Sequence, residues 1–434
     1  MNKNIEIILH IGAPKTASSA IQNFCIKHRE LLKEKGFYYP EHGLDTNGVS
    51  GGHSQLTGRL VNKDIASAKN WFDQHLSIAQ QEKKVLLISA EGMYGHLDLM
   101  QQVVVNLINK CFVIGYLRNP IESVISNHNQ GVKRAFSTKP LDKKINQLLR
   151  SPASRFHSGE ILLDWQRVFG GDNVCFKPFD SKLFKQNKIE YDFLDILGID
   201  TEDFSLFELP TGKINSSYSP SAEAFKLAIN PILDKNCHEL NAKLDEALQA
   251  YSDRIDERQP KAEQRVGSLA YKRLQSHFTS SNESLKKQLF SDYDTFWTNK
   301  EDINETHLKP YSGCIYSIEY VLTKSILTDD ILLSYLVKCL TSTDEAHFND
   351  NLRIIQLCLD IEPIEITNLN SINLNNQLNN LLKDNLQAAD YLRETALLFE
   401  NLGFKQEAYK LINKALQKRP NGPKIIEIEE RLRE

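Results

Sequence analysis

The sequence predicts an α/β protein with a central, mostly parallel β-sheet, followed by an all-α region. Two observations support this class. Over roughly the first half of the chain, short apolar runs rich in β-branched residues alternate with segments of helical periodicity, which is typical of a parallel sheet covered by helices. Beyond about residue 215 no clear strand pattern follows, and residues 220–252 and 261–290 both have helical periodicity.

Four strands are expected, and each is a short apolar run that ends near a turn signal or a charged residue. In chain order they read IEIILHI, KVLLISAE, CFVIGYLR and VCFKPFD, at residues 5–11, 84–91, 111–118 and 174–180. In parallel sheets, ligands bind outside the carboxyl ends of the strands. We therefore expect a site in the loops that follow the first three strands, at 12–16, 91–96 and 118–120.

Helices are expected between these strands. Residues 16–35 carry apolar side chains at three- and four-residue spacing, begin with Thr and Ser, and are followed by Gly36, so they predict one amphipathic helix. Helical patterns also cover 97–109 and about 121–132. Residues 133–157 are basic and lack strong periodicity, and they are expected either to contact an anionic acceptor or to form a solvated insertion.

Composition and charge exclude several classes of protein. The 434-residue chain has 52 basic and 56 acidic residues and a net charge of −4, which argues against nucleic-acid binding through bulk positive charge. Its seven cysteines are odd in number and include no CxxC pair, which argues against a disulfide framework or a zinc site. The longest apolar region, 103–117, is too short and too polar to span a membrane. A cytoplasmic protein is therefore expected.

Two domains are expected, an α/β domain at 1–298 and a helical domain at 299–434. Near 390–422 the helical domain has side chains where a 34-residue tetratricopeptide unit places its packing residues. These are Leu392, Ala396, Phe399, Gly403, Ala408, Ile412, Ala415 and Pro420. One unit cannot bury its own faces, so either the preceding helices complete a stack or the segment is a chance helical hairpin. Docking to a protein partner and dimerisation are both open roles for this domain.

The first motif, HIGAPKTASSAIQ at 10–22, runs from a strand through a short loop into a helix. Unpaired N–H groups at a helix start carry partial positive charge. Lys15 and the hydroxyls of Thr16, Ser18 and Ser19 stand beside them, and this combination predicts an anion site for phosphate or sulfate. The alternative is an N-cap cluster on a surface helix with an exposed lysine.

The second motif, YLRNPIESVISNHNQ at 116–130, begins where the third strand ends. Arg118 leaves the strand, Asn119 and Pro120 turn the chain, and Ser126 follows two helical turns later. Arginine at a strand end suits a bidentate phosphate contact, to which a serine hydroxyl can add a hydrogen bond. Taken alone, the motif can also be interpreted as an arginine that only caps the end of a strand.

Together the two motifs resemble the sulfotransferases that use 3′-phosphoadenylyl sulfate (PAPS), especially the bacterial group that acts on carbohydrates. In that family a loop of the form PKTGTT holds the 5′-phosphosulfate. The corresponding residues are Pro14, Lys15, Thr16, Ala17, Ser18 and Ser19. A motif RNPxxxxxS holds the 3′-phosphate, and Arg118, Asn119, Pro120 and Ser126 match it at the family's spacing. Similar stretches cover about 1–298, in the order GFYYP, GGHSQL, LLISAEGMY, WQRVFGGDNVCFKPFD, INSSYSPSAEAF and SSNESLKKQLF.

The resemblance implies a P-loop-like three-layer sulfotransferase fold. It also implies PAPS as co-substrate with no metal requirement, and transfer to a hydroxyl or amine of a glycan or polysaccharide acceptor in a bacterial cytoplasm. Lys15 would stabilise the charge that develops on the bridging oxygen of the leaving group. One residue departs from the family pattern, because the loop glycine is Ala17 here. If that position needs a positive φ, a Cβ costs about a kcal/mol or more.

The acceptor hydroxyl needs a general base, and the resemblance allows either a histidine or a glutamate. His53, in the GGHSQL loop, titrates near neutral pH, and Glu91 ends the second strand at the same edge of the sheet. We favour His53 as the base, with Glu91 as base or orienting residue, and assign His10 a structural role. Each residue also has an interpretation without a catalytic role. His53 would then be an ordinary loop histidine, and Glu91 would be the N-cap of a helix.

Weaker candidates lie near both motifs. Lys213, Asn215, Ser216 and Ser217 form a polar cluster that would close over the 3′-phosphate or act as an ordinary N-cap. His128 and Asn129 follow Ser126 and are expected to face the acceptor.

Two other functions remain open. A P-loop-like kinase is disfavoured because Walker A needs four residues before Gly-Lys-[ST], whereas only two separate Gly12 from Lys15. A degenerate nucleotide-binding scaffold with a protein-binding helical module is kept open by Ala17.

Overall fold

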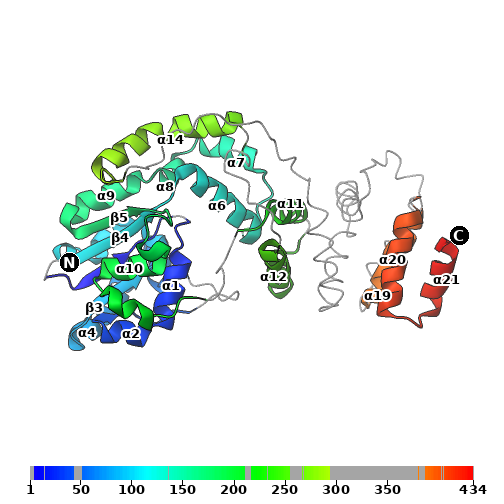
Figure 1. Ribbon diagram of the computed structural model, residues 1–434, viewed down its shortest axis with the longest axis horizontal. Helices are drawn as coiled ribbons and strands as arrows, with labels where there is room; N and C mark the ends of the chain where they lie inside the picture. Colours follow the sequence, from blue (N-terminus) through cyan, green and yellow to red (C-terminus); the bar gives the residue numbers. More distant parts are fainter. Residues whose placement is uncertain are drawn as a thin grey trace. The chain divides into compact units, whose positions relative to one another are not determined.

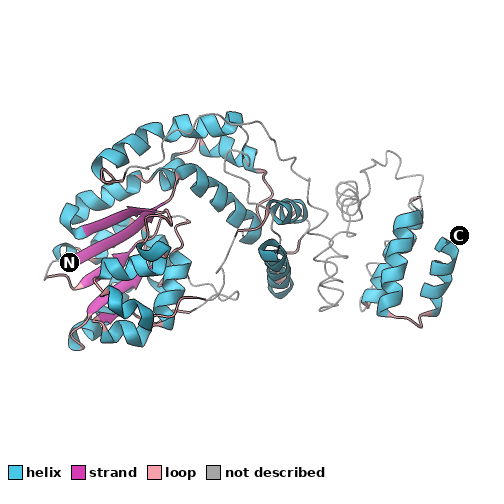
Figure 2. Cartoon of the chain, viewed as in Figure 1, coloured by secondary structure: helices cyan, strands magenta, loops and turns pink. Residues whose placement is uncertain are grey.

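The computed structural model describes residues 4–13, 15–43, 51–134, 136–210, 217–231, 233–254, 266, 268–293, 380, 387–401, 403 and 405–433. Its centre is a five-stranded sheet in the order β2-β3-β1-β4-β5, and every neighbouring pair is parallel (Figure 2). The strands are β1 (Ile7–His10), β2 (Phe37–Tyr38), β3 (Val85–Ser89), β4 (Cys111–Leu117) and β5 (Val174–Pro178). The predicted α/β class with a parallel sheet is confirmed.

The four predicted strands are confirmed, each slightly shorter than expected. Strand β2 was not predicted, because two residues are too few to produce a readable pattern. In the central strand β1, all four side chains are buried, as expected for a strand with both faces covered. Its register places His10 opposite Ser89 of β3 on one side and Ile114 of β4 on the other. The carboxyl ends of these three strands therefore meet at one edge of the sheet.

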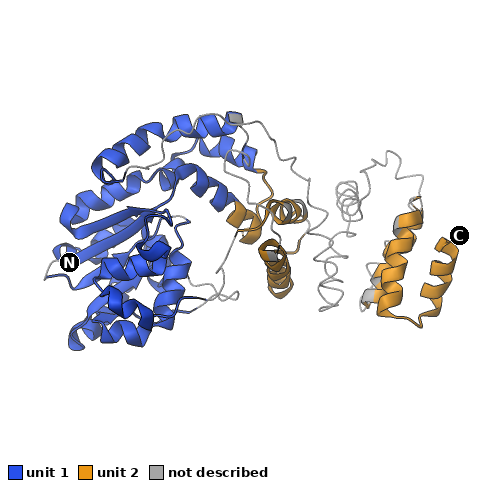
Figure 3. Cartoon of the chain, in the orientation of Figure 1, with its two compact units in different colours: residues 1–128, 141–216, 261–307 blue, residues 129–140, 217–260, 308–434 orange. Residues whose placement is uncertain are grey.

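Helices cover both faces of the sheet in unit 1, which comprises residues 1–128, 141–216 and 261–307 (Figures 1 and 3). Ile8 packs on one side against α1 (Ser18–Lys27), α2 (Arg29–Glu34) and α10 (Ile189–Leu197). Ile7 and Leu9 pack on the other side against a second layer. That layer consists of α3 (Ser54–Val61), α4 (Ile65–Gln81), α5 (Leu97–Val103), α9 (Glu160–Phe169) and the end of α14 (Ser268–Gln288). This alternation of side chains gives a sheet between two helical layers.

Three predicted helical segments differ from the structure. The single helix expected at 16–35 is broken at His28, whose φ is −109° and whose Nε2 lies 2.9 Å from the Glu208 carbonyl oxygen. The segment 97–109 contains α5 and then a short 3₁₀ turn that starts at Ile108. The helix expected at 121–132 is longer, and forms α6 (Pro120–Arg134).

The basic segment 133–157 is not a wholly solvated insertion. It contains α7 (Leu141–Leu148), whose Ile145 and Leu148 are buried in a cluster with residues of α6 and α14. It also contains α8 (Arg155–Ser158). Periodicity was hard to detect because only one side of a two-turn helix is apolar.

Unit 2 comprises residues 129–140, 217–260 and 308–434. It contains α11 (Pro220–Ile229), α12 (His238–Arg254), α19 (Ala388–Asn401), α20 (Lys405–Lys418) and α21 (Pro423–Arg433). The expected helical character after residue 215 holds throughout the described part of the chain. The predicted boundary at 298/299 lies outside the described residues and stays a prediction.

Helices α19 and α20 bury six of the eight side chains named for residues 390–422, whereas Gly403 and Pro420 are exposed, and the tetratricopeptide-like character stays a prediction. Leu392, Ala396 and Phe399 of α19 are buried, as are Ala408, Ile412 and Ala415 of α20. Gly403, with a φ of 89°, lies between the two helices. Helix α21 adds the buried side chains of Ile425 and Ile428. Whether further repeats precede this segment is a prediction about residues outside the described part.

No helix within the described ranges combines the length and the apolar character that crossing a bilayer requires.

Candidate functional site

The loop between β1 and α1 has an unusual backbone. Gly12, Lys15 and Ala17 all have left-handed φ values, of 53°, 66° and 59°. Left-handed residues within a turn direct successive N–H groups to the same side, and such concave turns bind anions. Helix α1 begins directly after this turn at Ser18, so its unpaired N–H groups add to the same positive end. Pro14 lies outside the described residues.

The loop is packed tightly against the end of β3. A Cβ on Gly12 would lie 2.8 Å from Ser18 Oγ and 3.4 Å from the Glu91 Cα atom, so only glycine fits there. The Thr16 hydroxyl donates to the Ala13 carbonyl at 2.9 Å and braces the turn. Ser18 Oγ is buried and has no hydrogen-bond partner among the described residues, while Ser19 is half-buried. A buried hydroxyl without a partner is costly, which indicates a site that a polar ligand completes.

The structure brings the two sequence motifs together at this edge. Arg118 follows β4, and its Nη1 lies 3.5 Å from the carbonyl oxygen of Lys15. Its Nε donates to Glu122 at 3.1 Å, and its guanidinium lies 5.8 Å from the centre of the Phe179 ring. Ser126 is buried on α6, about 9 Å further along the helix than Pro120 at 1.5 Å per residue.

Glu91 connects the loop to an adjoining pocket. It directly follows β3, and its side chain is exposed to the pocket. Desolvation by the surrounding protein raises the pKa of this carboxyl group, while the positive charge of Lys15 and a hydrogen bond from the Lys15 backbone lower it. The Ser18 hydroxyl is close enough to lower this pKa as well, although the two groups form no well-aligned hydrogen bond. A carboxylate with a raised pKa close to a lysine is suited to accept a proton near neutral pH.

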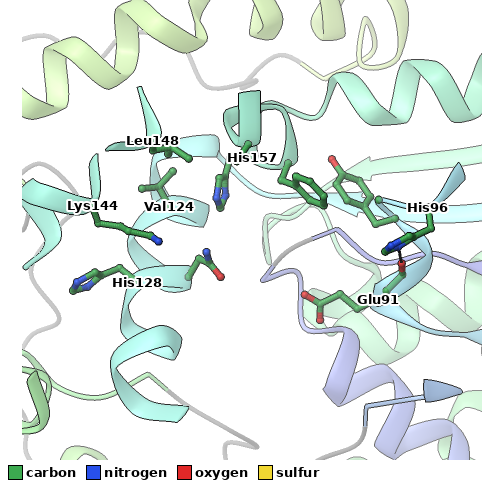
Figure 4. A pocket seen from close by; sticks show the side chains of 13 residues that line it. Glu91, His96, Val124, His128, Lys144, Leu148 and His157 are labelled. Atoms are coloured by element: carbon green, nitrogen blue, oxygen red, sulfur yellow. Dashed lines mark hydrogen bonds between the residues drawn. The ribbon is translucent and has the colours of Figure 1, made fainter. Parts of the chain in front are cut away.

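The pocket has a volume of about 410 Å³ and lies wholly within unit 1. Of the predicted catalytic and cofactor-binding residues, only Glu91 lines it. The other lining residues are Gly92, Tyr94, Gly95, His96, Val124, Asn127, His128, Lys144, Leu148, Ala153, Phe156 and His157. Figure 4 shows Lys144 and His128 on one side of the pocket, and Glu91 and His96 on the other.

His53 occupies a different environment from the one expected of a base. It is 1% exposed, and its Nε2 lies 3.0 Å from the Pro40 carbonyl oxygen. Its Nδ1 lies 3.0 Å from both the backbone nitrogen and the carbonyl oxygen of Ser89. Both ring nitrogens therefore contact polar groups of the backbone, and in the neutral imidazole one of the two carries the proton. Burial lowers the pKa of this imidazole to about 3, so it is neutral at pH 7.

The expectation that His53 reaches the cleft is therefore corrected. Both of its ring nitrogens are used by the backbone, and it does not line the pocket. The preceding Gly52 explains how the loop is held, because a Cβ there would lie 2.2 Å from the Ser89 carbonyl oxygen. His53 fastens the GGHSQL loop to the end of β3.

His10 has the structural position expected of it. It is fully buried, its Nδ1 lies 2.7 Å from Ser89 Oγ, and its ring packs against Phe193. Burial lowers the pKa of His10 to about 3.

The weaker candidates have separate outcomes. His128 lines the pocket, whereas Asn129 belongs to unit 2 and bonds to Glu223 Oε2 at 2.6 Å and to the Tyr218 backbone. The expectation that Asn129 faces the acceptor is therefore not supported by its contacts. Residues 213–216 lie outside the described residues.

Sequence reasoning did not single out Lys144, Phe156 and His157, which also line the pocket. The only signal was the basic character of 133–157, which does not distinguish one side chain from its neighbours.

Comparisons of the chain with protein families, with curated proteins and with solved structures give no match. Within the described ranges, no group of three or more His, Cys, Asp and Glu residues is arranged to hold a metal ion. A functional assignment therefore rests on the chain's own residues and their geometry.

We predict that Ala17→Gly stabilises the protein by about 0.5–1 kcal/mol. The left-handed φ of Ala17 costs an L-residue about 1–2 kcal/mol, part of which the greater freedom of an unfolded glycine cancels. Urea unfolding measures the change. The matched control is Ala20→Gly within α1, which is expected to destabilise by about 0.5–1 kcal/mol. If both variants lost the same free energy of unfolding, the claim that Ala17 is strained would be wrong.

We predict that His53→Asn weakens the dependence of stability on acid pH. A histidine whose pKa falls from its ordinary 6.5 to about 3 on folding contributes stability that is fully present above pH 6.5 and is lost as the pH falls towards 3. Its share of the slope is about 1.4 kcal/mol per pH unit. Urea unfolding at pH 7, 6 and 5 should show a shallower slope in the variant. The exposed His277→Asn serves as control, and an unchanged slope in His53→Asn would refute the buried neutral state.

Proposed function

We propose that the protein is a sulfotransferase that moves a sulfuryl group from PAPS to a hydroxyl or amine of a glycan. One observation carries the proposal. The left-handed loop at the start of α1 holds a buried Ser18 hydroxyl that has no hydrogen-bond partner among the described residues, and Arg118 from the neighbouring strand lies against that loop. Glu91, from the strand on the other side, faces an adjoining pocket. Two cationic positions beside one carboxylate fit a donor with two separate anionic groups and an acceptor in the adjoining pocket.

The two ends of the donor would be bound differently. The loop N–H groups, Lys15 and the hydroxyls of Thr16, Ser18 and Ser19 would hold the 5′-phosphosulfate. Arg118 and Ser126 would hold the 3′-phosphate. The Glu122 carboxylate accepts a hydrogen bond from one guanidinium N–H of Arg118, so the 3′-phosphate would have to compete with that carboxylate.

Glu91 is better placed than His53 to act as the base. The acceptor oxygen attacks sulfur, and the bond between sulfur and the bridging oxygen of the 5′-phosphate breaks. The bonding electron pair leaves with adenosine 3′,5′-bisphosphate, whose charge Lys15 stabilises. The acceptor proton passes to the Glu91 carboxylate. His53 is buried and does not line the pocket, and a charge on its ring would be poorly solvated there.

A second candidate, a degenerate nucleotide-binding scaffold, is favoured by one observation, the left-handed Ala17. In that case the C-terminal helices, as a docking or dimerisation module, would be the functional part. Binding and turnover of PAPS separate this candidate from the enzyme.

We predict that adenosine 3′,5′-bisphosphate raises the melting temperature clearly more than 5′-AMP or ATP with magnesium. A ligand at 100 times its dissociation constant adds about 2.7 kcal/mol to the native state. Arg118→Ala should remove most of the difference between the bisphosphate and AMP, because it deletes the 3′-phosphate contact.

The control for this experiment is Arg167→Ala, an exposed arginine on α9 that pairs only with Asp164 among the described residues. It should leave the bisphosphate shift unchanged. Stabilisation by ATP with magnesium alone would replace the proposal with a kinase-like function. Absence of any shift would favour the degenerate scaffold.

We predict that Glu91→Gln lowers kcat for sulfuryl transfer by about 10²–10⁴-fold while bisphosphate binding persists. The acidic limb of the pH–rate profile, which reports a carboxyl group with a raised pKa, should disappear with it. Transfer of label from ³⁵S-PAPS to a mixture of polysaccharides measures activity. Exposed Glu30→Gln is the control. Retained activity in Glu91→Gln would rule out Glu91 as the base.

A further inference from the structure

The pocket beside Glu91 has walls of different chemistry. Lys144, on α7, provides the positive charge, and Glu91 provides the negative charge on the other side (Figure 4). Val124 and Leu148 form an apolar part between α6 and α7, and Phe156 adds an aromatic ring. Neither Lys15 nor Arg118 lines this space, so its positive charge does not belong to the two cationic positions assigned to the donor.

Lys144 is held in place by its helix and has no ion-pair partner among the described residues. Its neighbours on α7, Ile145 and Leu148, are buried in an apolar cluster, which fixes the helix and the direction of the lysine. Within the described ranges, no carboxylate forms an ion pair with Lys144, which is half-buried. Its charge also acts on His157 in the pocket wall. Burial is the main cause that lowers the pKa of His157 to about 4, and the nearby Lys144 lowers it further. His157 is therefore neutral at pH 7, and Lys144 is the cation that an anion would meet.

Phe156 offers a flat apolar surface at the same pocket. Phe156 lines the pocket and is 44% exposed, so part of its ring is open to a ligand. The ring rests on Gly95, where a Cβ would lie 2.6 Å from its Cε1 atom, and its centre is 6.3 Å from that of Tyr94. An exposed aromatic ring can cover the apolar C–H face of a sugar, while the sugar's polar groups remain free for hydrogen bonds.

We propose that the pocket binds a sugar ring that carries an anionic substituent. The ring lies against Phe156, the anion pairs with Lys144, and the hydroxyl to be modified faces Glu91. This inference rests on the proposed function, for which it names the acceptor class. Glu91 repels the anion and Lys144 attracts it, so the two opposite charges select one orientation of the sugar. A carboxylate and a sulfate group share the chemistry that Lys144 would recognise.

The inference is tested by binding to the full chain in the presence of saturating adenosine 3′,5′-bisphosphate. Three tetrasaccharide probes are compared by calorimetric titration: a hyaluronan fragment with carboxylates, neutral chitotetraose, and chitotetraose sulfated at O6. Because hydrogen bonds to charged groups are worth about ten- to hundred-fold in affinity, at least one anionic probe should bind about tenfold or more tightly than the neutral one. The two anionic probes show which anion is preferred.

Two variants of neighbouring lysines provide the decisive comparison. Lys144→Gln should remove the preference for anionic probes, whereas Lys143→Gln, at an exposed position on the same helix, should keep it. Both variants lose the same charge, so equal effects would indicate a long-range field and would overturn the inference. Phe156→Ala should weaken all three probes by a similar factor. Bisphosphate binding, unchanged in each variant, shows that the protein is folded.

Failure of the inference and failure of the proposed function give different results. If the bisphosphate binds but the neutral and anionic probes bind equally, or none binds, the inference is wrong and the sulfotransferase proposal stands. If the anionic probes bind with the expected dependence on Lys144 but the bisphosphate does not bind, the pocket is an anionic-sugar site and the sulfotransferase proposal is wrong.

Discussion

The alignment of three parallel strands at one edge of the sheet is the constraint on which the candidate site depends. His10, at the end of β1, pairs in register with Ser89 of β3 and Ile114 of β4. Since parallel pairing fixes where each strand ends, the segments that follow must leave the sheet side by side. Those segments carry Lys15, Glu91 and Arg118. Strand pairing thus brings residues more than a hundred positions apart in the chain to one edge of the sheet.

Close packing at this edge maintains a loop that would be unfavourable by itself. The loop contains a left-handed Lys15 and a left-handed Ala17, and such residues persist only where their surroundings over-determine the backbone. At Gly12 and Gly52 the backbone lies so close to its neighbours that a Cβ atom would clash. This close approach lets the loop and the GGHSQL segment pack against the end of β3. Backbone strain occurs here together with a buried Ser18 hydroxyl that no described residue pairs, which is the combination expected where a ligand completes the hydrogen bonding.

Burial gives opposite properties to the two residues that were candidates for the base. His53 is enclosed by protein, so desolvation removes its charge and the backbone takes both ring nitrogens. Glu91 is open to the pocket, and the protein around it raises its pKa while Lys15 opposes the change. The same physical effect therefore makes the histidine a fixed structural link and leaves the carboxylate able to exchange a proton. The pocket then combines that carboxylate with Lys144 and an exposed aromatic ring.

The sequence by itself determined the strands β1, β3, β4 and β5 and the tight strand–loop–helix turn after β1, because buried runs, glycines and hydroxyl residues at a helix start act locally. Strand β2, the break at His28 and the neutral state of His53 were decided by tertiary structure. In each case the partner is distant in the chain: Phe37 pairs with Val85, the His28 ring contacts the Glu208 carbonyl, and His53 bonds to Pro40 and Ser89. Lys144 differs from Lys143 only through the burial of Ile145 and Leu148, which orients α7. A pattern along the chain reports which side chains prefer burial, whereas contacts between distant segments decide which polar group meets which partner.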